Sequence, residues 1–226
     1  MVLFPKEQSS AQALPELLAP AGSLEKLQVA VHYGADAVYL GGKQHSLRAR
    51  AANFSEEDLR TGVAYAHANG VKVYATVNIF AHNDDLDGLV TSLRLLAQTG
   101  VDACIVADPG VIRLAREHAP DMPLHLSTQA NVTNQESAVF WQEQGLARIN
   151  LARELGLKEI EVIRTRVGCQ LEVFVHGALC ISYSGRCLLS TYFAGRDANQ
   201  GDCAQPCRYT YALVEEKRPG QDFPIE

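Results

Sequence analysis

Short apolar segments alternate with amphipathic segments along most of the chain. The apolar segments are 15–22, 36–42, 71–78, 102–108, 123–128, 147–152 and 170–177. Each has the length of a buried strand. In the segments between them, apolar residues recur every three or four positions, which is the spacing of one helix face. The pattern therefore predicts a strand followed by a helix, repeated along the chain.

Several of the predicted helices carry a start signal. The predicted N-cap residues are Ser23, Ser55, Asp108 and Thr133. Asp58 and Glu136 each lie three residues after a cap, as in a capping box, and Pro109 suits the first position of a helix. For Asp108 and Thr133 we therefore expect capping rather than a role in a site.

Strand–helix repeats at this spacing predict right-handed βαβ units on a parallel sheet. Seven strands favour a TIM-like (β/α)8 barrel over an open dinucleotide-binding sheet, and no G-x-G-x-x-G motif follows the first strand. Segment 208–216 is a candidate eighth strand, but no helix separates it from 170–177. We therefore expect an α/β barrel that is incomplete at the C-terminus of this 226-residue chain, with the closing strand beyond Glu226.

The pattern divides the chain into four regions. Residues 1–13 are predicted to be a flexible leader, and residues 14–177 the barrel of βα repeats. Residues 178–210 are predicted to form a cysteine-rich loop that holds a metal or a cluster. Residues 211–226 are predicted to begin a further segment that is truncated.

Charge and hydropathy narrow the class of protein. Lys and Arg number 20 against 26 Asp and Glu, for a net charge of −6, which argues against a broad basic surface for nucleic acid but leaves room for a local basic groove. No apolar run is long enough to cross a bilayer, and the N-terminus lacks the pattern of a signal peptide. We expect a cytoplasmic protein without a membrane partner. Thiols stay reduced there, so clustered cysteines indicate metal binding or catalysis.

Four of the six cysteines fall in one short segment, at Cys180, Cys187, Cys203 and Cys207. Four thiolates suit either tetrahedral zinc or a 4Fe–4S cluster. The C-x2-C knuckle of structural zinc sites is absent, and the wider C-x6-C-x15-C-x3-C spacing favours the cluster, with zinc as the alternative. Cys104 and Cys169 stand apart and are expected to pack as small apolar side chains.

Polar residues mark the carboxyl ends of the predicted strands, where barrel enzymes place their chemistry. The predicted substrate-binding residues there are Asn78, Gln129 and Asn131. The predicted catalytic residues are Arg153, Glu172 and His176. Glu172 shares a strand face with His176. If that face points inward, its carboxylate needs a partner, and Arg153 on the neighbouring strand is the expected one.

Two arginines in the second loop, Arg48 and Arg50, form a further candidate subsite. Their guanidinium groups could bind an anionic part of a ligand, such as a phosphate. A solvated loop is the other interpretation of the same pair.

The stretch "EVFVHGALCISYSGRCLLS", residues 172–190, resembles the signature of the collagenase-like peptidases, peptidase family U32. The stretches "ELLAPAGSLEKL", "GADAVYLGG", "RARAANF", "STQANVTN" and "LAREL" also resemble this family, and the resemblance covers nearly the whole chain from Pro15 onward. The stretch "GRDANQGDCAQPCRY" is most similar to the subgroup implicated in making 5-hydroxyuridine at the wobble position of tRNA.

This resemblance implies a function and its requirements. Several family members are thought to hold a 4Fe–4S cluster through four cysteines, and prephenate is implicated as a metabolic requirement in the RNA branch. The resemblance implies tRNA as the partner of the full-length protein and further sequence past Glu226, where another cluster ligand could lie. We therefore expect an iron–sulfur-dependent, RNA-modifying hydroxylase that acts on wobble uridine.

Two other functions remain open at this point. A collagenase-like peptidase, as the family name states, needs a nucleophile and a base, and Cys180 with His176 is the one near pair. The sequence contains neither an H-E-x-x-H zinc motif nor a G-x-S-x-G elbow. The third possibility is a zinc-stabilised scaffold that binds a partner. The sequence gives no indication of the oligomeric state.

Overall fold

The computed structural model describes residues 14–42, 45–46, 54–177 and 180–225. The predicted leader, residues 1–13, lies outside this range, and so do Arg48 and Arg50.

Within the described residues, seven strands form one parallel sheet in which each strand pairs with its neighbour in sequence. The strands are β1 (Leu18–Pro20), β2 (Ala37–Gly41), β3 (Lys72–Val77), β4 (Ala103–Val106), β5 (Leu124–Leu126), β6 (Arg148–Asn150) and β7 (Gln170–Glu172). The predicted parallel βα repeats are therefore confirmed, with each strand shorter than its apolar segment.

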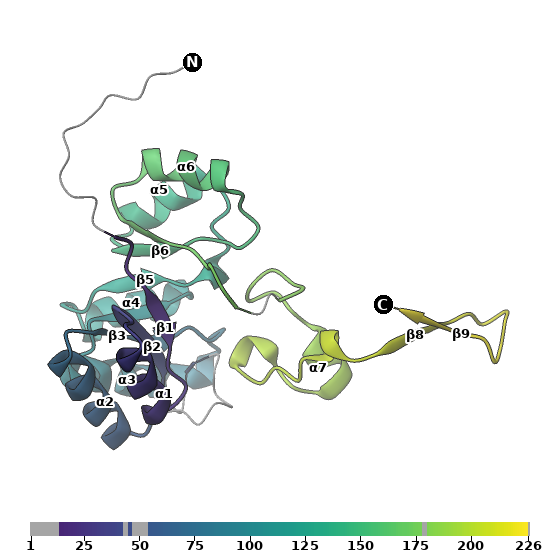
Figure 1. Ribbon diagram of the computed structural model, residues 1–226, viewed down its shortest axis with the longest axis horizontal. Helices are drawn as coiled ribbons and strands as arrows, with labels where there is room; N and C mark the ends of the chain where they lie inside the picture. The colour runs from purple at the N-terminus through teal and green to yellow at the C-terminus, as the bar shows by residue number, and fades with distance from the viewer. Residues whose placement is uncertain (1–13, 43–44, 47–53, 178–179, 226) are drawn as a thin grey trace, which may run out of the picture.

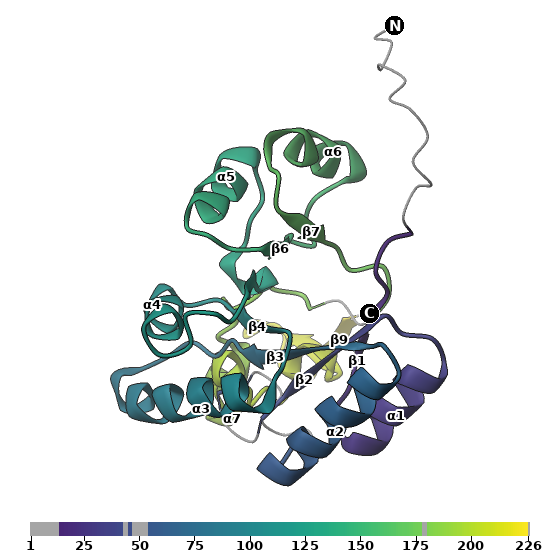
Figure 2. The ribbon, with the colours of Figure 1, turned by 90° about the vertical axis from the view of Figure 1, so that its left-hand side faces the viewer.

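Helices connect successive strands and cover one face of the sheet. They are α1 (Leu24–His32), α2 (Glu56–Ala68), α3 (Leu86–Thr99), α4 (Pro109–His118), α5 (Gln135–Glu143) and α6 (Leu157–Arg166), with short 3-10 helices η1 (Asn83–Asp85) and η2 (Thr128–Ala130). In Figure 2 the six α-helices follow one another around the outside of the sheet. None of the helices that the structure describes is long and apolar enough to span a membrane.

The predicted helix caps are confirmed at three positions. The side chains of Ser23, Ser55 and Asp108 accept backbone N–H groups of the helices they precede, and Ser55 forms the predicted capping box with Asp58. The prediction for Thr133 is wrong, because α5 begins one residue later and Asn134 accepts the N–H of Ser137 at 2.9 Å.

A contact between distant strands shows that the sheet is curled. Glu16, just before β1, accepts a hydrogen bond of 2.8 Å from Arg148, the first residue of β6. In a flat sheet, five strand spacings would separate β1 from β6 by about 24 Å. The sheet is therefore curled toward a barrel, and no pairing between β1 and β7 is present among the described strands. The prediction of an incomplete α/β barrel is confirmed.

Alternate residues of each strand point to opposite faces of the curled sheet. On β3, Val73, Ala75 and Val77 belong to the large apolar core shared with the helices. Tyr74 belongs instead to a small inner cluster with Ala37, Ala103 and Ile105. The side chains on the inner face therefore determine how much of the barrel interior is filled.

After β7 the chain crosses the carboxyl ends of the strands and then leaves the barrel. The elements are α7 (Leu189–Ala194), η3 (Ala198–Gln200), η4 (Pro206–Arg208), β8 (Tyr211–Val214) and β9 (Asp222–Ile225). β8 pairs with β9 as an antiparallel hairpin, which projects away from the barrel in Figure 1. Segment 208–216, the candidate that the missing helix argued against, therefore does not supply an eighth strand to the described sheet.

Candidate functional site at the carboxyl end of the sheet

A cavity of about 330 Å³ lies between the carboxyl ends of the strands and the cysteine segment, which we define as residues 180–210. Its lining from the barrel side includes Tyr39, Thr76, Asn78, Ile105, Ser127, Gln129, Asn150, Arg153 and Glu172. Its lining from the cysteine segment includes Cys180, Tyr183, Ser184, Cys187, Asn199, Cys203 and Cys207. Sites of this size and place are where barrel proteins bind small ligands.

Inward-pointing residues at the tops of the strands form the floor of the cavity. On β3, Thr76 lies two residues beyond the inner Tyr74, and its hydroxyl donates to the carbonyl of Leu40 at 3.0 Å. Ser46 and Thr76 share a hydrogen bond of 2.7 Å. A side chain at Gly41 would collide with Ser46, so glycine at the end of β2 allows this packing.

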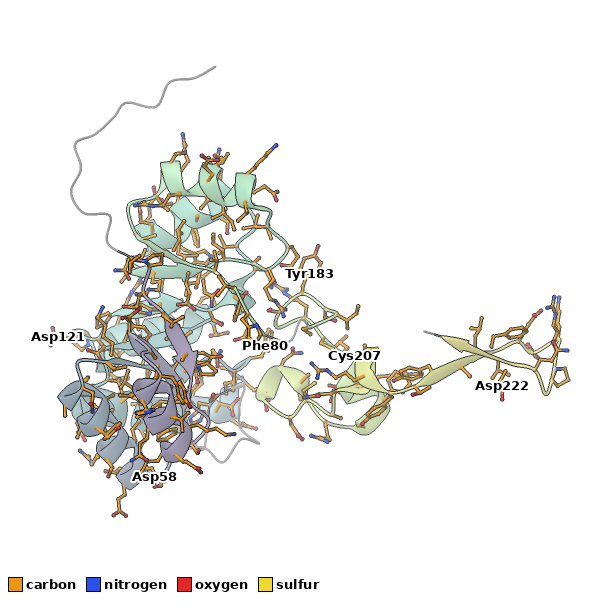
Figure 3. All side chains as sticks on the ribbon, viewed as in Figure 1. Asp58, Phe80, Asp121, Tyr183, Cys207 and Asp222 are labelled. Atoms are coloured by element: carbon orange, nitrogen blue, oxygen red, sulfur yellow. The ribbon has the colours of Figure 1, made fainter. Side chains whose placement is uncertain are left out.

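The cysteine segment is attached to the end of β3 through its 3-10 helix η3. The backbone N–H of Phe80 donates to the carbonyl of Asn199 at 2.9 Å, and the Gln200 amide donates back to the carbonyl of Phe80 at 3.2 Å. Figure 3 labels Phe80 beside the barrel and Tyr183 and Cys207 on the cysteine segment next to it. This attachment fixes one side of the cavity.

A second attachment involves two residues that the sequence predicts for the site. Arg153 donates from Nη2 to the hydroxyl of Ser184 at 2.7 Å, and Asn131 donates to the carbonyl of Ser184 at 2.9 Å. Gly185, at a φ of 71°, packs close to the side chain of Gln129. The polar ring at the strand ends therefore also holds the cysteine segment in place.

The four clustered cysteines are free thiols that line the same cavity. The backbone N–H of Gln205 donates to the sulfur of Cys203 at 3.3 Å, and the Asn199 amide donates to the carbonyl of Cys187 at 3.1 Å. In the described part of the chain, no three His, Cys, Asp or Glu side chains stand close enough together to hold a metal ion. The donor set fits a thiolate-bound group in its chemistry, and binding would require the sulfurs to draw together.

The other two cysteines differ from the four in the cavity. Cys104 is fully buried on β4, where burial raises the pKa of its thiol to about 12. Burial also raises the pKa of the partly buried Cys169. A thiol with a raised pKa is a poor nucleophile and a poor ligand, which agrees with the packing role expected for both.

Glu172 on β7 is held by β6. Asn150 donates from Nδ2 to Oε1 of Glu172 at 2.7 Å, and Nη1 of Arg148 lies 3.6 Å from Oε2. The predicted pairing of Glu172 with Arg153 is therefore wrong, since Arg153 points to the cysteine segment instead. Burial raises the pKa of Glu172, while the charge of Arg148 opposes this shift.

Below the cavity, the amino end of the barrel is closed by a group of four side chains that we name the amino-end cluster: Glu16, Lys72, Tyr74 and Arg148. Glu16 accepts hydrogen bonds of 2.8 Å from each of the other three. Burial alone would raise the pKa of Glu16, but these three bonds outweigh it and lower the pKa to about 2.

His125 packs edge-on against Tyr74 of this cluster, with the ring centroids 4.7 Å apart. Burial, reinforced by the charge of Arg148, lowers the pKa of His125 to about 3. The amino end of the barrel interior is thus filled by a neutral histidine and a compact set of paired charges.

The structure places the remaining predicted site residues as follows. Asn78, Gln129, Arg153 and Glu172 line the cavity. Asn131 lines a neighbouring, more open depression with Tyr183 and Arg186. His176 is exposed and is not among the described residues that line the cavity. The catalytic and binding roles assigned to these residues stay predictions.

Sequence reasoning missed Asn150. Only 7% of its surface is exposed, and its Oδ1 is buried without a hydrogen-bond partner among the residues that the structure describes. The signal available in the sequence was its position two residues after Arg148 on a predicted strand, which places both side chains on one face.

The chain is similar to proteins of known family. Residues 22–224 match the family model described as Peptidase family U32. The chain is 52% identical over 204 residues to "tRNA hydroxylation protein P" of Escherichia coli, covering 90% of this chain and 45% of that protein. It is 50% identical over 201 residues to a tRNA hydroxylation protein of Bacillus subtilis, covering 89% of this chain and 48% of that protein.

Two further similarities bear on chemistry and fold. A 23S rRNA 5-hydroxycytidine synthase of Escherichia coli is 42% identical over 202 residues, which cover 89% of this chain and 30% of that protein. A solved U32 peptidase structure superimposes with a TM-score of 0.61 at 23% identity, over 75% of this chain and 72% of the other. The chain thus spans about half the length of the tRNA hydroxylation proteins that it matches.

Proposed function

The chain belongs to peptidase family U32, and we propose that the full-length protein is an RNA-modifying hydroxylase that acts on the wobble uridine of tRNA, with the cavity above the curled sheet as its active site. One observation carries the proposal: four free thiols and a set of polar side chains line a single cavity at the carboxyl end of the sheet. The relatives at about half identity, named as tRNA hydroxylation proteins, support it. A tRNA substrate would place the working protein in the cytoplasm.

The cavity suits a single nucleobase rather than a duplex. Enzymes that modify a base take it out of the stack into a concave site and bind its edge with polar groups. Here the strand ends offer amides at Asn78, Gln129 and Asn150 and a guanidinium at Arg153. Because these groups stand on strand ends or just beyond them, they would hold the base in a fixed orientation.

We further propose that Cys180, Cys187, Cys203 and Cys207 hold a 4Fe–4S cluster. Such a cluster, when bound, would supply one-electron redox chemistry beside the base. The backbone N–H of Gln205 donates a hydrogen bond to the sulfur of Cys203. Hydrogen bonds to a ligand sulfur adjust the reduction potential of a bound cluster. Prephenate, which the family resemblance implies, is included in the proposal as a metabolic requirement of the reaction.

Analysis of tRNA by mass spectrometry tests the function. The gene is deleted in its host, and full-length protein is returned as the wild type, as Cys187→Ser or as Cys169→Ser. We expect 5-hydroxyuridine to disappear on deletion and to return with the wild type and with Cys169→Ser, whose thiol lies away from the cavity. With Cys187→Ser it should stay absent. Unchanged hydroxylation after deletion would refute the proposed function.

Iron analysis after anaerobic purification tests the cluster separately. Wild-type full-length protein should hold about four iron atoms per chain, and Cys203→Ser should lose them while Cys169→Ser retains them. One tightly bound zinc and no iron would instead support a zinc-stabilised scaffold. Peptide cleavage that disappears in Cys180→Ser but persists in Cys203→Ala would support the peptidase.

A further inference from the structure

Among the residues that the structure describes, three buried side-chain atoms lack a hydrogen-bond partner, in His125, Asn131 and Asn150, and of these residues Asn150 lines the cavity. Asn150 is 7% exposed, its Nδ2 donates to Glu172 at 2.7 Å, and its Oδ1 has no hydrogen-bond partner within the described part of the chain. A buried acceptor without a partner is costly, and native proteins rarely keep one without a reason. Asn150 is one of the residues that line the cavity, so its buried amide lies at the cavity wall.

Glu172 determines which end of the Asn150 amide faces the ligand. Burial raises the pKa of Glu172, while the charge of Arg148, whose Nη1 lies 3.6 Å from Oε2, opposes this shift and favours the carboxylate. Oε1 of Glu172 accepts the 2.7 Å hydrogen bond from Nδ2 of Asn150. An ionised carboxylate only accepts hydrogen bonds, so it must face the NH2 group of Asn150. The carbonyl Oδ1 is then left for the cavity. The pair therefore presents an acceptor, and the matching ligand atom must be a donor.

We propose that Asn150, oriented by Glu172, accepts the N3–H of a uracil ring and so makes this site specific for uridine. This inference rests on the proposed function. On its pairing edge uracil has one N–H donor between two carbonyl acceptors, whereas cytosine carries an acceptor at N3. Arg153 and Asn78, which carry N–H donors, line the same cavity and suit the two carbonyls.

The test uses full-length protein and two synthetic anticodon stem–loop RNAs, one with uridine and one with 3-methyluridine at the wobble position. Methylation removes the N3–H and fills the space in front of it. We expect the wild type to bind the uridine RNA at least about tenfold more tightly than the methylated RNA, because an unpaired buried polar group costs roughly this much or more. This comparison requires no variant and is independent of whether a substitution folds.

Asn150→Ala sharpens the test. Removing the amide should remove the preference, so that the two RNAs bind within about twofold of each other. The control Asn69→Ala changes an exposed asparagine at the end of α2 and should keep the full preference. If Asn150 had a purely structural role, Asn150→Ala would weaken the binding of both RNAs equally and leave the ratio of their affinities unchanged.

The outcomes separate this inference from the proposed function. Equal binding of the two RNAs by the wild type, or an undiminished preference in Asn150→Ala, overturns the role of Asn150 even if 5-hydroxyuridine still depends on the gene. Unchanged 5-hydroxyuridine after gene deletion overturns the function, and the role of Asn150 with it.

Discussion

The two ends of the barrel interior use similar residue types in opposite ways. At the amino end, the other three members of the amino-end cluster all donate to Glu16. At the carboxyl end, Asn150 keeps an unpaired acceptor and four thiols remain free around a cavity. Paired polar groups hold the fold, whereas unpaired groups at a cavity are available to a ligand. His125 Nδ1, beside the amino-end cluster, also lacks a hydrogen-bond partner among the described residues, so it is the cavity rather than an unpaired atom alone that distinguishes the carboxyl end.

The largest effect on stability is expected from breaking the amino-end cluster. Arg148 is almost fully buried and contacts both Glu16 and Glu172. Arg148→Met should lower the free energy of unfolding by about 3–5 kcal/mol, because it removes the buried guanidinium that the partly buried carboxylates of Glu16 and Glu172 share. Urea denaturation followed by circular dichroism measures this change. A loss below about 1 kcal/mol would show that the cluster is not a stability element.

Acid should weaken the same end of the barrel in two stages. The pKa of His125 is lowered from 6.5 to about 3, so the unfolded chain binds this proton first and stability falls as the pH drops below about 6.5. The pKa of Glu16 is lowered from 4.5 to about 2, so its contribution to stability is lost as the pH falls between these values. Glu172 opposes the trend, because a raised pKa favours the folded state in acid.

Denaturation at a series of pH values measures this dependence. His125→Gln should flatten the curve between about pH 6.5 and 4.5, and Glu16→Gln should flatten it between about pH 4.5 and 2. A wild-type curve that stays level down to pH 4.5 would argue that His125 is not held neutral.

At the carboxyl end, Arg153→Ala should loosen the cysteine segment without unfolding the barrel. The substitution removes the 2.7 Å hydrogen bond to Ser184, a charged contact worth about 1.5–3 kcal/mol. Hydrogen exchange should accelerate roughly tenfold in residues 180–210 and stay unchanged in β3 and β4. Equal acceleration in both regions would show that the barrel and the cysteine segment open together.

The smallest effect on stability is expected from a surface ion pair, which serves as the reference for the buried Arg148. Arg60 and Glu56 lie one turn apart on α2, 2.9 Å from each other and exposed. Arg60→Ala should change the free energy of unfolding by no more than about 0.5 kcal/mol, measured in the same urea series. A larger loss would mean that exposed and buried ion pairs contribute similarly to stability, so the loss expected for Arg148→Met could not be assigned to burial.

The sequence was sufficient to predict the parallel repeats, because apolar segments and helix caps are local signals. It misassigned the partner of Glu172 because strand register is not local. Asn150 is the register partner of Glu172, while Arg153 lies beyond the end of β6. The cysteine spacing predicted four sulfurs close enough to share one group. The four thiols do line one cavity, but in the described part of the chain no three His, Cys, Asp or Glu side chains stand close enough together to hold a metal ion. The separation of the sulfurs depends on how the segment folds over the strands, which is not a local signal.

One wall of the cavity is the cysteine segment, a single continuous stretch of chain, whereas the opposite wall is assembled from side chains at the ends of several strands. Because the two parts come from separate regions of the chain, a substitution in the cysteine segment can change one wall of the cavity without altering the strands that form the other.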